Sequence, residues 1–167
     1  MKPVIYQIVV RYFGNTNTTN QQAGTIETNG CGKFADITET ALQALKDLGV
    51  THLWLTGCLR QATLTAYPEV GLPSDDPDVV KGRAGSLYAV RDYFDVCPDY
   101  AQHPANRLDE FTALVGRVHR AGLKALLDFV PTTSPAVITL SVSQNSTLER
   151  VMTQESFSHA TITSFTS

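Results

Sequence analysis

The fold class is best indicated by one segment, Leu45-Lys46-Asp47-Leu48-Gly49-Val50-Thr51-His52-Leu53-Trp54-Leu55-Thr56. It begins as the end of an amphipathic helix, and Gly49 predicts where that helix stops, because glycine readily adopts the left-handed conformation that ends a helix. The apolar residues that follow predict a buried strand over Val50–Leu55. A helix that leads through a glycine into an apolar strand is typical of α/β folds with parallel strands.

The same pattern continues upstream of this stretch. Val4–Val10 is a β-branched run that predicts a first strand. Asp36, with Glu39 three residues later, predicts the N-cap of a helix over Ile37–Leu48. The apolar stripe of that helix has helical spacing and consists of Ile37, Ala41, Leu42, Leu45 and Leu48.

Downstream, the pattern repeats once more. Asn106 predicts the N-cap of a helix over Arg107–Ala121, and Gly122 predicts its end. The apolar run Leu123–Val130 predicts a third strand, with Asp128 near its C-terminal end. The chain therefore predicts a β-α-β-α-β unit with right-handed crossovers, and places an acidic side chain where α/β folds carry out their chemistry.

Two segments between these elements, Asn15–Gly32 and Thr56–Leu87, are predicted to be long loops because they are rich in polar, proline and glycine residues. The composition changes after Pro131, since Thr132–Ser167 holds 16 Ser or Thr among 36 residues. Such a segment buries too little apolar surface to offset the entropy of ordering its backbone. We therefore expect a folded part over residues 1–131 and an irregular, poorly structured tail over residues 132–167.

Composition excludes several classes of protein. The 167 residues are 43% hydrophobic and carry a net charge of -3, which suits one globular domain and argues against a nucleic-acid partner. No apolar run approaches the roughly 20 residues of a membrane-spanning helix, and no signal peptide is seen, so we expect a cytoplasmic location and no membrane partner. The three cysteines form no C-x-x-C pair, which argues against a zinc site.

Four segments of the chain carry a more specific signal, namely Val4–Gly14, Leu45–Thr56, Gly85–Val96 and Phe111–Pro131. Together they resemble the α-amylase family of glycoside hydrolases: its opening strand, its first helix and second strand, its Gly-Tyr-x-x-x-Asp-Tyr loop, and its third strand. The resemblance implies that the chain is the N-terminal β-α-β-α-β portion of a (β/α)8 TIM barrel, incomplete, with an irregular C-terminal tail.

The resemblance also implies two substrate-binding residues. Tyr88 matches the loop tyrosine whose ring stacks on the sugar at the cleavage site, although Ala89 stands where the family has Asp. Asp128 matches the Asp that anchors the third-strand motif and supports the active-site network without acting as nucleophile. Asp92 and Tyr93 are interpreted as scaffold. The implied substrate of the full-length form is an α-glucan or α-glucoside, which it would hydrolyse or transfer.

The catalytic groups are not expected in these 167 residues. Retaining glycosidases need a nucleophile and a general acid about 5–5.5 Å apart. In the family these carboxyl groups follow the fourth and fifth strands, and a full barrel needs roughly 250 residues. We therefore expect no catalytic residue and no activity. Several relatives bind calcium, but the run Asp75–Asp78 lacks the spacing and the glycine of a calcium loop, so we expect no cofactor and no metal.

The family pattern is lost at one point. In the family the third strand ends Asp-x-x-x-Asn-His, whereas Pro131 is followed by Thr132-Thr133-Ser134-Pro135. These four residues can be encoded ACC-ACG-TCG-CCC, and one added A gives AAC-CAC-GTC-GCC, which reads Asn-His-Val-Ala. The family motif reappears where the pattern breaks, which favours a slip of the reading frame at Thr132. Residues 132–167 are then an out-of-frame product.

Other classes of function stay open. A non-catalytic carbohydrate-binding or regulatory α/β module is one alternative, for which Tyr88 and Trp54 are the candidate aromatic platforms, with Trp54 expected to be buried in its strand. A dinucleotide-binding protein is another, but no G-x-G-x-x-G follows the first strand. The third strand would leave an open sheet edge, so we also expect non-specific self-association.

Overall fold

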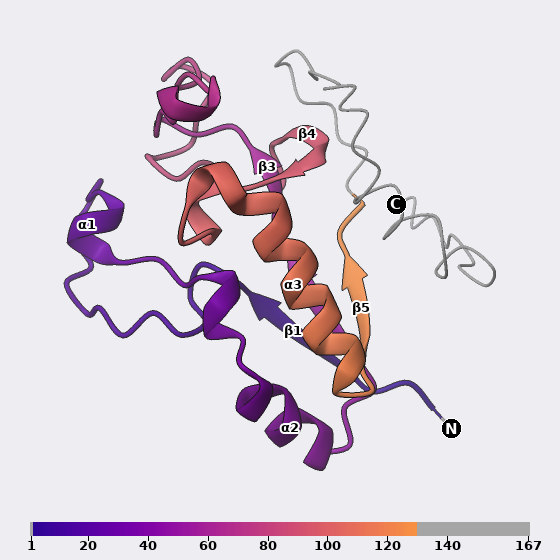
Figure 1. The fold of residues 1–167 in the computed structure, drawn as a ribbon. Coiled ribbons are helices and arrows are strands. Elements are labelled where there is room, and N and C mark those ends of the chain that lie inside the picture. The colour runs from indigo at the N-terminus through magenta and orange to yellow at the C-terminus, as the bar shows by residue number, and fades with distance from the viewer. Residues whose placement is uncertain (1, 130–167) are drawn as a thin grey trace, which may run out of the picture.

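The computed structural model of the chain describes residues 2–129, which form strands and helices (Figure 1). The strands and α-helices are β1 Ile5–Val9, α1 Ile26–Asn29, α2 Glu39–Asp47, β2 His52–Thr56, β3 Leu59–Gln61, β4 Val90–Val96, α3 Arg107–Arg120 and β5 Lys124–Leu127. Short 3-10 turns occupy Phe34–Asp36, Pro68–Val70, Pro98–Tyr100 and Pro104–Asn106. The predicted tail, residues 132–167, lies outside the described residues.

The main sheet has three parallel strands in the order β1-β2-β5. Tyr6 of β1 pairs with Leu53 of β2, and Leu53 in turn pairs with Ala125 of β5. The three strands that the sequence predicts are therefore adjacent and parallel, as expected for an incomplete barrel. β5 follows α3 through Gly122, whose φ of 72° supplies the left-handed turn predicted at that position.

One face of this sheet forms the hydrophobic core. Strand residues alternate between the two faces, so Leu53 and Leu55 of β2 point the same way, and both are fully buried. They belong to one cluster with Leu42 of α2 and with Leu114 and Val118 of α3. In Figure 1, α3 crosses in front of the strands.

The start of α2 corrects a sequence prediction. Thr38, not Asp36, is the N-cap, and its hydroxyl accepts a hydrogen bond from the backbone N–H of Ala41. Asp36 ends the preceding 3-10 turn, and its carboxylate accepts from the backbone N–H of Lys33 at 2.7 Å. The carboxylate closes the turn before the helix, so it is not available to cap the helix itself. Asn106 precedes α3 as predicted, but its side chain makes no capping hydrogen bond.

The segments predicted to be loops hold regular structure as well. β3, inside Thr56–Leu87, pairs antiparallel with β4 in a second, two-stranded sheet, and α1 forms inside Asn15–Gly32. β3 has three residues, too few for a strand pattern to be recognised, and its pairing partner lies about thirty residues further along the chain. Figure 1 shows β3 and β4 beyond the C-terminal ends of β1 and β5.

Across residues 2–129, no helix is both long enough and apolar enough to cross a membrane.

Candidate functional site

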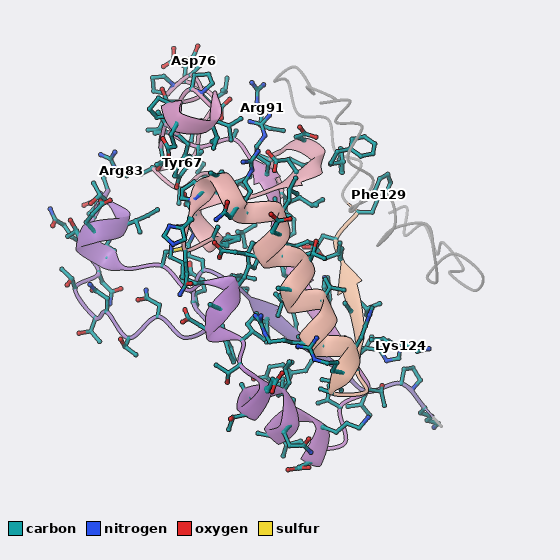
Figure 2. The ribbon with its side chains drawn as sticks, in the orientation of Figure 1. Tyr67, Asp76, Arg83, Arg91, Lys124 and Phe129 are labelled. Atoms are coloured by element: carbon teal, nitrogen blue, oxygen red, sulfur yellow. The ribbon has the colours of Figure 1, made fainter. Side chains whose placement is uncertain are left out.

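Asp128 lies just after β5, at the end of the sheet where the parallel strands finish. One of its carboxylate oxygens accepts a hydrogen bond from the indole N–H of Trp54 in β2. The other accepts from the backbone N–H of Gly57, directly after β2, at 2.8 Å. The carboxylate therefore joins the ends of two neighbouring strands. Figure 2 labels Lys124 and Phe129 at the two ends of β5, and Asp128 is the neighbour of Phe129.

Trp54 lies on the face of the sheet opposite the helices. It alternates with the buried Leu53 and Leu55, so its side chain points away from the core. The prediction that it is buried in its strand is wrong, since it is only half-buried. Gln7 shares this face, because it pairs with Trp54 in the register, and its amide donates to the hydroxyl of Thr56 at 2.7 Å. The face thus carries polar groups, and the indole finds its hydrogen-bond partner in Asp128.

Tyr88 is brought to the same end of the sheet through its neighbour Leu87. Gly57 has a φ of 63°, and a Cβ built on it would lie 2.6 Å from the Cβ of Leu87. Only a glycine allows this close approach without strain. Gly57 therefore packs its Cα against Leu87 and donates its backbone N–H to Asp128. Tyr88 is 50% exposed, and its own backbone N–H donates to the hydroxyl of Ser86 at 3.3 Å.

Cys58 follows Gly57 and is fully buried beside this group. Burial, with a smaller contribution from the charge of Asp128, raises the pKa of the Cys58 thiol to about 12. A thiol in this state is protonated at neutral pH and is a poor nucleophile. Cys58 thus acts as a small apolar side chain under the site.

A buried ion-pair network fixes the start of α3 to β4. Asp95 is 5% exposed, and its carboxylate accepts two hydrogen bonds from the guanidinium of Arg107, at 2.6 and 2.9 Å. Arg60 of β3 lies 3.6 Å from the same carboxylate and 3.9 Å from that of Asp92. Asp92 also accepts from the backbone N–H of Phe94 at 2.9 Å. These two acids are therefore engaged in holding the small sheet and the helix together.

Sequence reasoning missed a second such centre at Asp99. Its carboxylate pairs with Arg11 at the end of β1 and accepts a hydrogen bond from the hydroxyl of Tyr67, while its carbonyl accepts from Lys33 at 2.6 Å. Burial, and then the charge of Asp99, raise the pKa of Tyr67 well above its ordinary value. No local motif links these residues, because they are up to 88 positions apart in the chain.

The acidic run Asp75–Asp78 is occupied by the chain's own groups. Asp75 accepts from the backbone N–H of Thr63 at 2.9 Å and pairs with Arg91 at 2.9 Å, while Asp76 accepts from the backbone N–H of Asp78. Among residues 2–129, no cluster of His, Cys, Asp or Glu is arranged to hold a metal ion.

The parallel strands, the helices and the polar groups that follow the strands define a class of protein, the barrel of parallel strands and helices. These residues form one part of such a barrel. The sequence profile of the family described as "Alpha amylase, catalytic domain" matches residues 7–149. The chain belongs to the α-amylase family.

Two relatives illustrate the match. The chain is 30% identical to the cyclomaltodextrin glucanotransferase of Bacillus sp. (strain 1-1) over 148 residues, which are 83% of this chain and 19% of the relative. It is 30% identical to the trehalose-6-phosphate hydrolase of Bacillus subtilis (strain 168) over 129 residues, which are 77% of this chain and 17% of the relative. The chain thus spans about a fifth of the length of these relatives.

Solved structures share the fold. The α-amylase of Geobacillus thermoleovorans, in complex with acarbose, superposes with a TM-score of 0.50 at 24% identity, over 76% of this chain and 22% of that one. A cyclomaltodextrin glucanotransferase with a three-domain ABC distribution gives a TM-score of 0.50 at 22% identity, over 76% of this chain and 25% of that one. Both superpositions bear out the prediction of a partial barrel.

Proposed function

We propose that this chain forms the substrate-side, N-terminal portion of a glycosidase barrel that acts on α-glucans or α-glucosides. Tyr88 stacks on a glucose ring, because a flat aromatic face suits the apolar face of a pyranose. Asp128 joins the ends of β2 and β5 at the same end of the sheet. The observation that carries the proposal is the double role of Gly57, which bonds Asp128 through its N–H at 2.8 Å and packs closely against Leu87, the neighbour of Tyr88.

We propose further that these 167 residues bind sugar without cleaving it. Hydrolysis with retention requires two carboxyl groups about 5–5.5 Å apart on either side of the glycosidic bond. The buried acids Asp92, Asp95 and Asp99 are each paired with an arginine. Asp128 is bonded to two groups of the sheet, which suits a supporting role. In the family the nucleophile and the general acid belong to later strands.

The binding half of the proposal is tested with the chain's single tryptophan. Trp54 is bonded to Asp128, so its fluorescence reports on the site without a label. Titration with maltoheptaose is expected to shift this emission with saturation. Tyr88→Ala is expected to weaken the binding at least tenfold, and Tyr88→Phe, which keeps the ring, is expected to retain it. Equal affinities for Tyr88→Ala and the wild-type chain would refute the role of Tyr88.

The out-of-frame origin of residues 132–167 is a separate proposal. It is supported by the loss of the Asn-His motif after Pro131 and by its return in a neighbouring frame when third codon positions are chosen freely. The family profile continues past Pro131 to residue 149, so the proposed boundary rests on the motif alone. Sequencing of the coding DNA tests it. A frame after codon 131 that encodes the remaining barrel motifs supports the slip, and stop codons in every frame refute it.

A further inference from the structure

Gln61 is an unusual side chain, because it is long, polar and only 1% exposed. It lies at the end of β3, where its backbone pairs with Val90 of β4. Its side-chain amide donates to the backbone carbonyl of Ala84 at 2.7 Å. Gln61 therefore holds both ends of the segment Ala84–Val90, one end through its side chain and the other through its backbone. Tyr88 lies inside this segment.

The neighbours of Gln61 hold the same segment through backbone groups. The carbonyl of Arg83 accepts from the backbone N–H of Leu64 at 2.9 Å and from the hydroxyl of Thr63 at 3.0 Å. The backbone N–H of Ala62 donates to the carbonyl of Ala89 at 2.9 Å. Gly85 has a φ of 74°, and a Cβ on it would overlap the carbonyl oxygen of Ala62. Residues 61–64 thus form a support along which residues 83–89 lie.

Tyr88 is not held in place by burial, since half of its surface is exposed. The backbone that carries the ring is held by residues 61–64, so this support contributes to where the ring lies. A ring that is already in position loses less conformational entropy when a sugar stacks on it, which increases affinity.

Gln61 itself gains little from its burial. Its amide oxygen has no hydrogen-bond partner among the described residues, and a buried polar atom without a partner destabilises a fold. An apolar side chain of the same length would avoid this cost but would leave the carbonyl of Ala84 without its donor. The hydrogen bond of Gln61 therefore mainly stabilises the segment that carries Tyr88.

We propose that Gln61 is the positioning residue for the Tyr88 loop, residues 84–88. It keeps the loop closed over the end of β2 and presents the ring of Tyr88 in one orientation. Its importance for sugar binding rests on the proposed function, whereas its effect on the loop does not.

The test compares Gln61→Met with Gln43→Met in the full chain. Met keeps the length of Gln and removes its hydrogen bonds. Gln43 is the matched control, because its side-chain amide also donates at 2.8 Å, to Asp47, but on the exposed surface of α2. Amide hydrogen exchange of residues 84–89 is expected to be at least tenfold faster in Gln61→Met and unchanged in Gln43→Met. Unchanged exchange in both variants would overturn the proposal.

A second measurement separates positioning from a loss of overall stability. The protected amides of α3 are expected to exchange at the wild-type rate in Gln61→Met, because the removal of the unpaired amide oxygen offsets part of the lost hydrogen bond. Uniformly faster exchange across α3 and the loop would assign Gln61 a general structural role and overturn the proposal. If Gln61→Met does not fold, Thr63→Val is measured in its place. It removes the hydrogen bond to the carbonyl of Arg83 and the one accepted from the backbone N–H of Thr65. Faster exchange confined to residues 84–89 is expected, and unchanged exchange there would overturn the proposal.

Sugar binding then distinguishes this inference from the proposed function. With maltoheptaose as the probe, Gln61→Met is expected to weaken binding, and Gln61→Met with Tyr88→Ala is expected to bind no more weakly than Tyr88→Ala alone, because both act through one ring. Additive losses would overturn the positioning role. If Tyr88→Ala binds as well as the wild type, the proposed function fails, and the exchange data still decide whether Gln61 holds the loop.

Discussion

Asp128→Asn is the substitution that probes the join between β2 and β5 most directly. The carboxylate accepts from two donors, the indole N–H of Trp54 and the backbone N–H of Gly57. An asparagine has nearly the same shape but only one acceptor oxygen, so its NH₂ group must face one of these donors. The substitution thus removes one hydrogen bond to a charged group and weakens the other.

The expected loss follows from these two contacts. A hydrogen bond to a charged group contributes about 1.5–3 kcal/mol. Because Asp128 is half-buried and water can reach the vacated donor in part, we expect a loss of about 2 kcal/mol in the free energy of unfolding. Asp78→Asn, in an exposed loop, is the control and is expected to change stability by less than about 0.5 kcal/mol.

Urea unfolding followed by Trp54 fluorescence and by far-ultraviolet circular dichroism measures both variants. The emission of the folded Asp128→Asn chain is also expected to change, because the indole loses a charged partner. A change in stability below about 0.5 kcal/mol for Asp128→Asn, with unaltered emission, would show that the carboxylate does not join the strands in solution.

Three further predictions concern the surroundings of the site. Gly57→Ala is expected to destabilise the chain by about 1–3 kcal/mol, because alanine is strained at a φ of 63° and its Cβ meets Leu87; urea unfolding measures this. Arg107→Ala is expected to destabilise the chain by about 3 kcal/mol, because Asp95 stays buried without the guanidinium that donates two hydrogen bonds to it. An unchanged free energy of unfolding would contradict the network. Stability is expected to fall as pH rises from 9 towards 12, because an unfolded thiol ionises near its ordinary pKa of 9.0 while Cys58 stays protonated to about 12, and the unfolded state then binds fewer protons. Cys58→Ala is expected to lose less stability over this pH range than the wild-type chain. An identical dependence of stability on pH would show that Cys58 is not its cause.

The parts of the fold that the sequence predicts are those with local, periodic patterns. The stripe of α2 and the apolar runs of the three parallel strands determine both the element and the face that it buries, so their existence and order follow from spacing alone. Spacing does not determine where these elements end, because capping depends on the conformation of single residues. Thr38 and Asp36 are both good capping residues, and only the preceding 3-10 turn decides between them.

The site is predictable only where a motif marks it. Tyr88 and Asp128 belong to recognisable segments, and the structure places them at the same end of the sheet. Gln61 and Gly57 carry no such mark. Gln61 contacts Ala84 across 23 positions, and the close approach of Gly57 to Leu87 spans a segment with no periodic pattern. The partners of a buried polar side chain depend on tertiary packing, which composition and spacing do not contain.

We propose above that these residues belong to the substrate side of an α-glucan-active barrel and that its catalytic carboxyl groups lie outside them. The most direct test compares the purified 167-residue chain with the product of a frame-restored gene, by the release of reducing ends from starch and maltoheptaose. We expect no turnover above the blank for the 167-residue chain and measurable turnover for the restored product. Turnover by the 167-residue chain that persists after contaminating amylases are removed would contradict it.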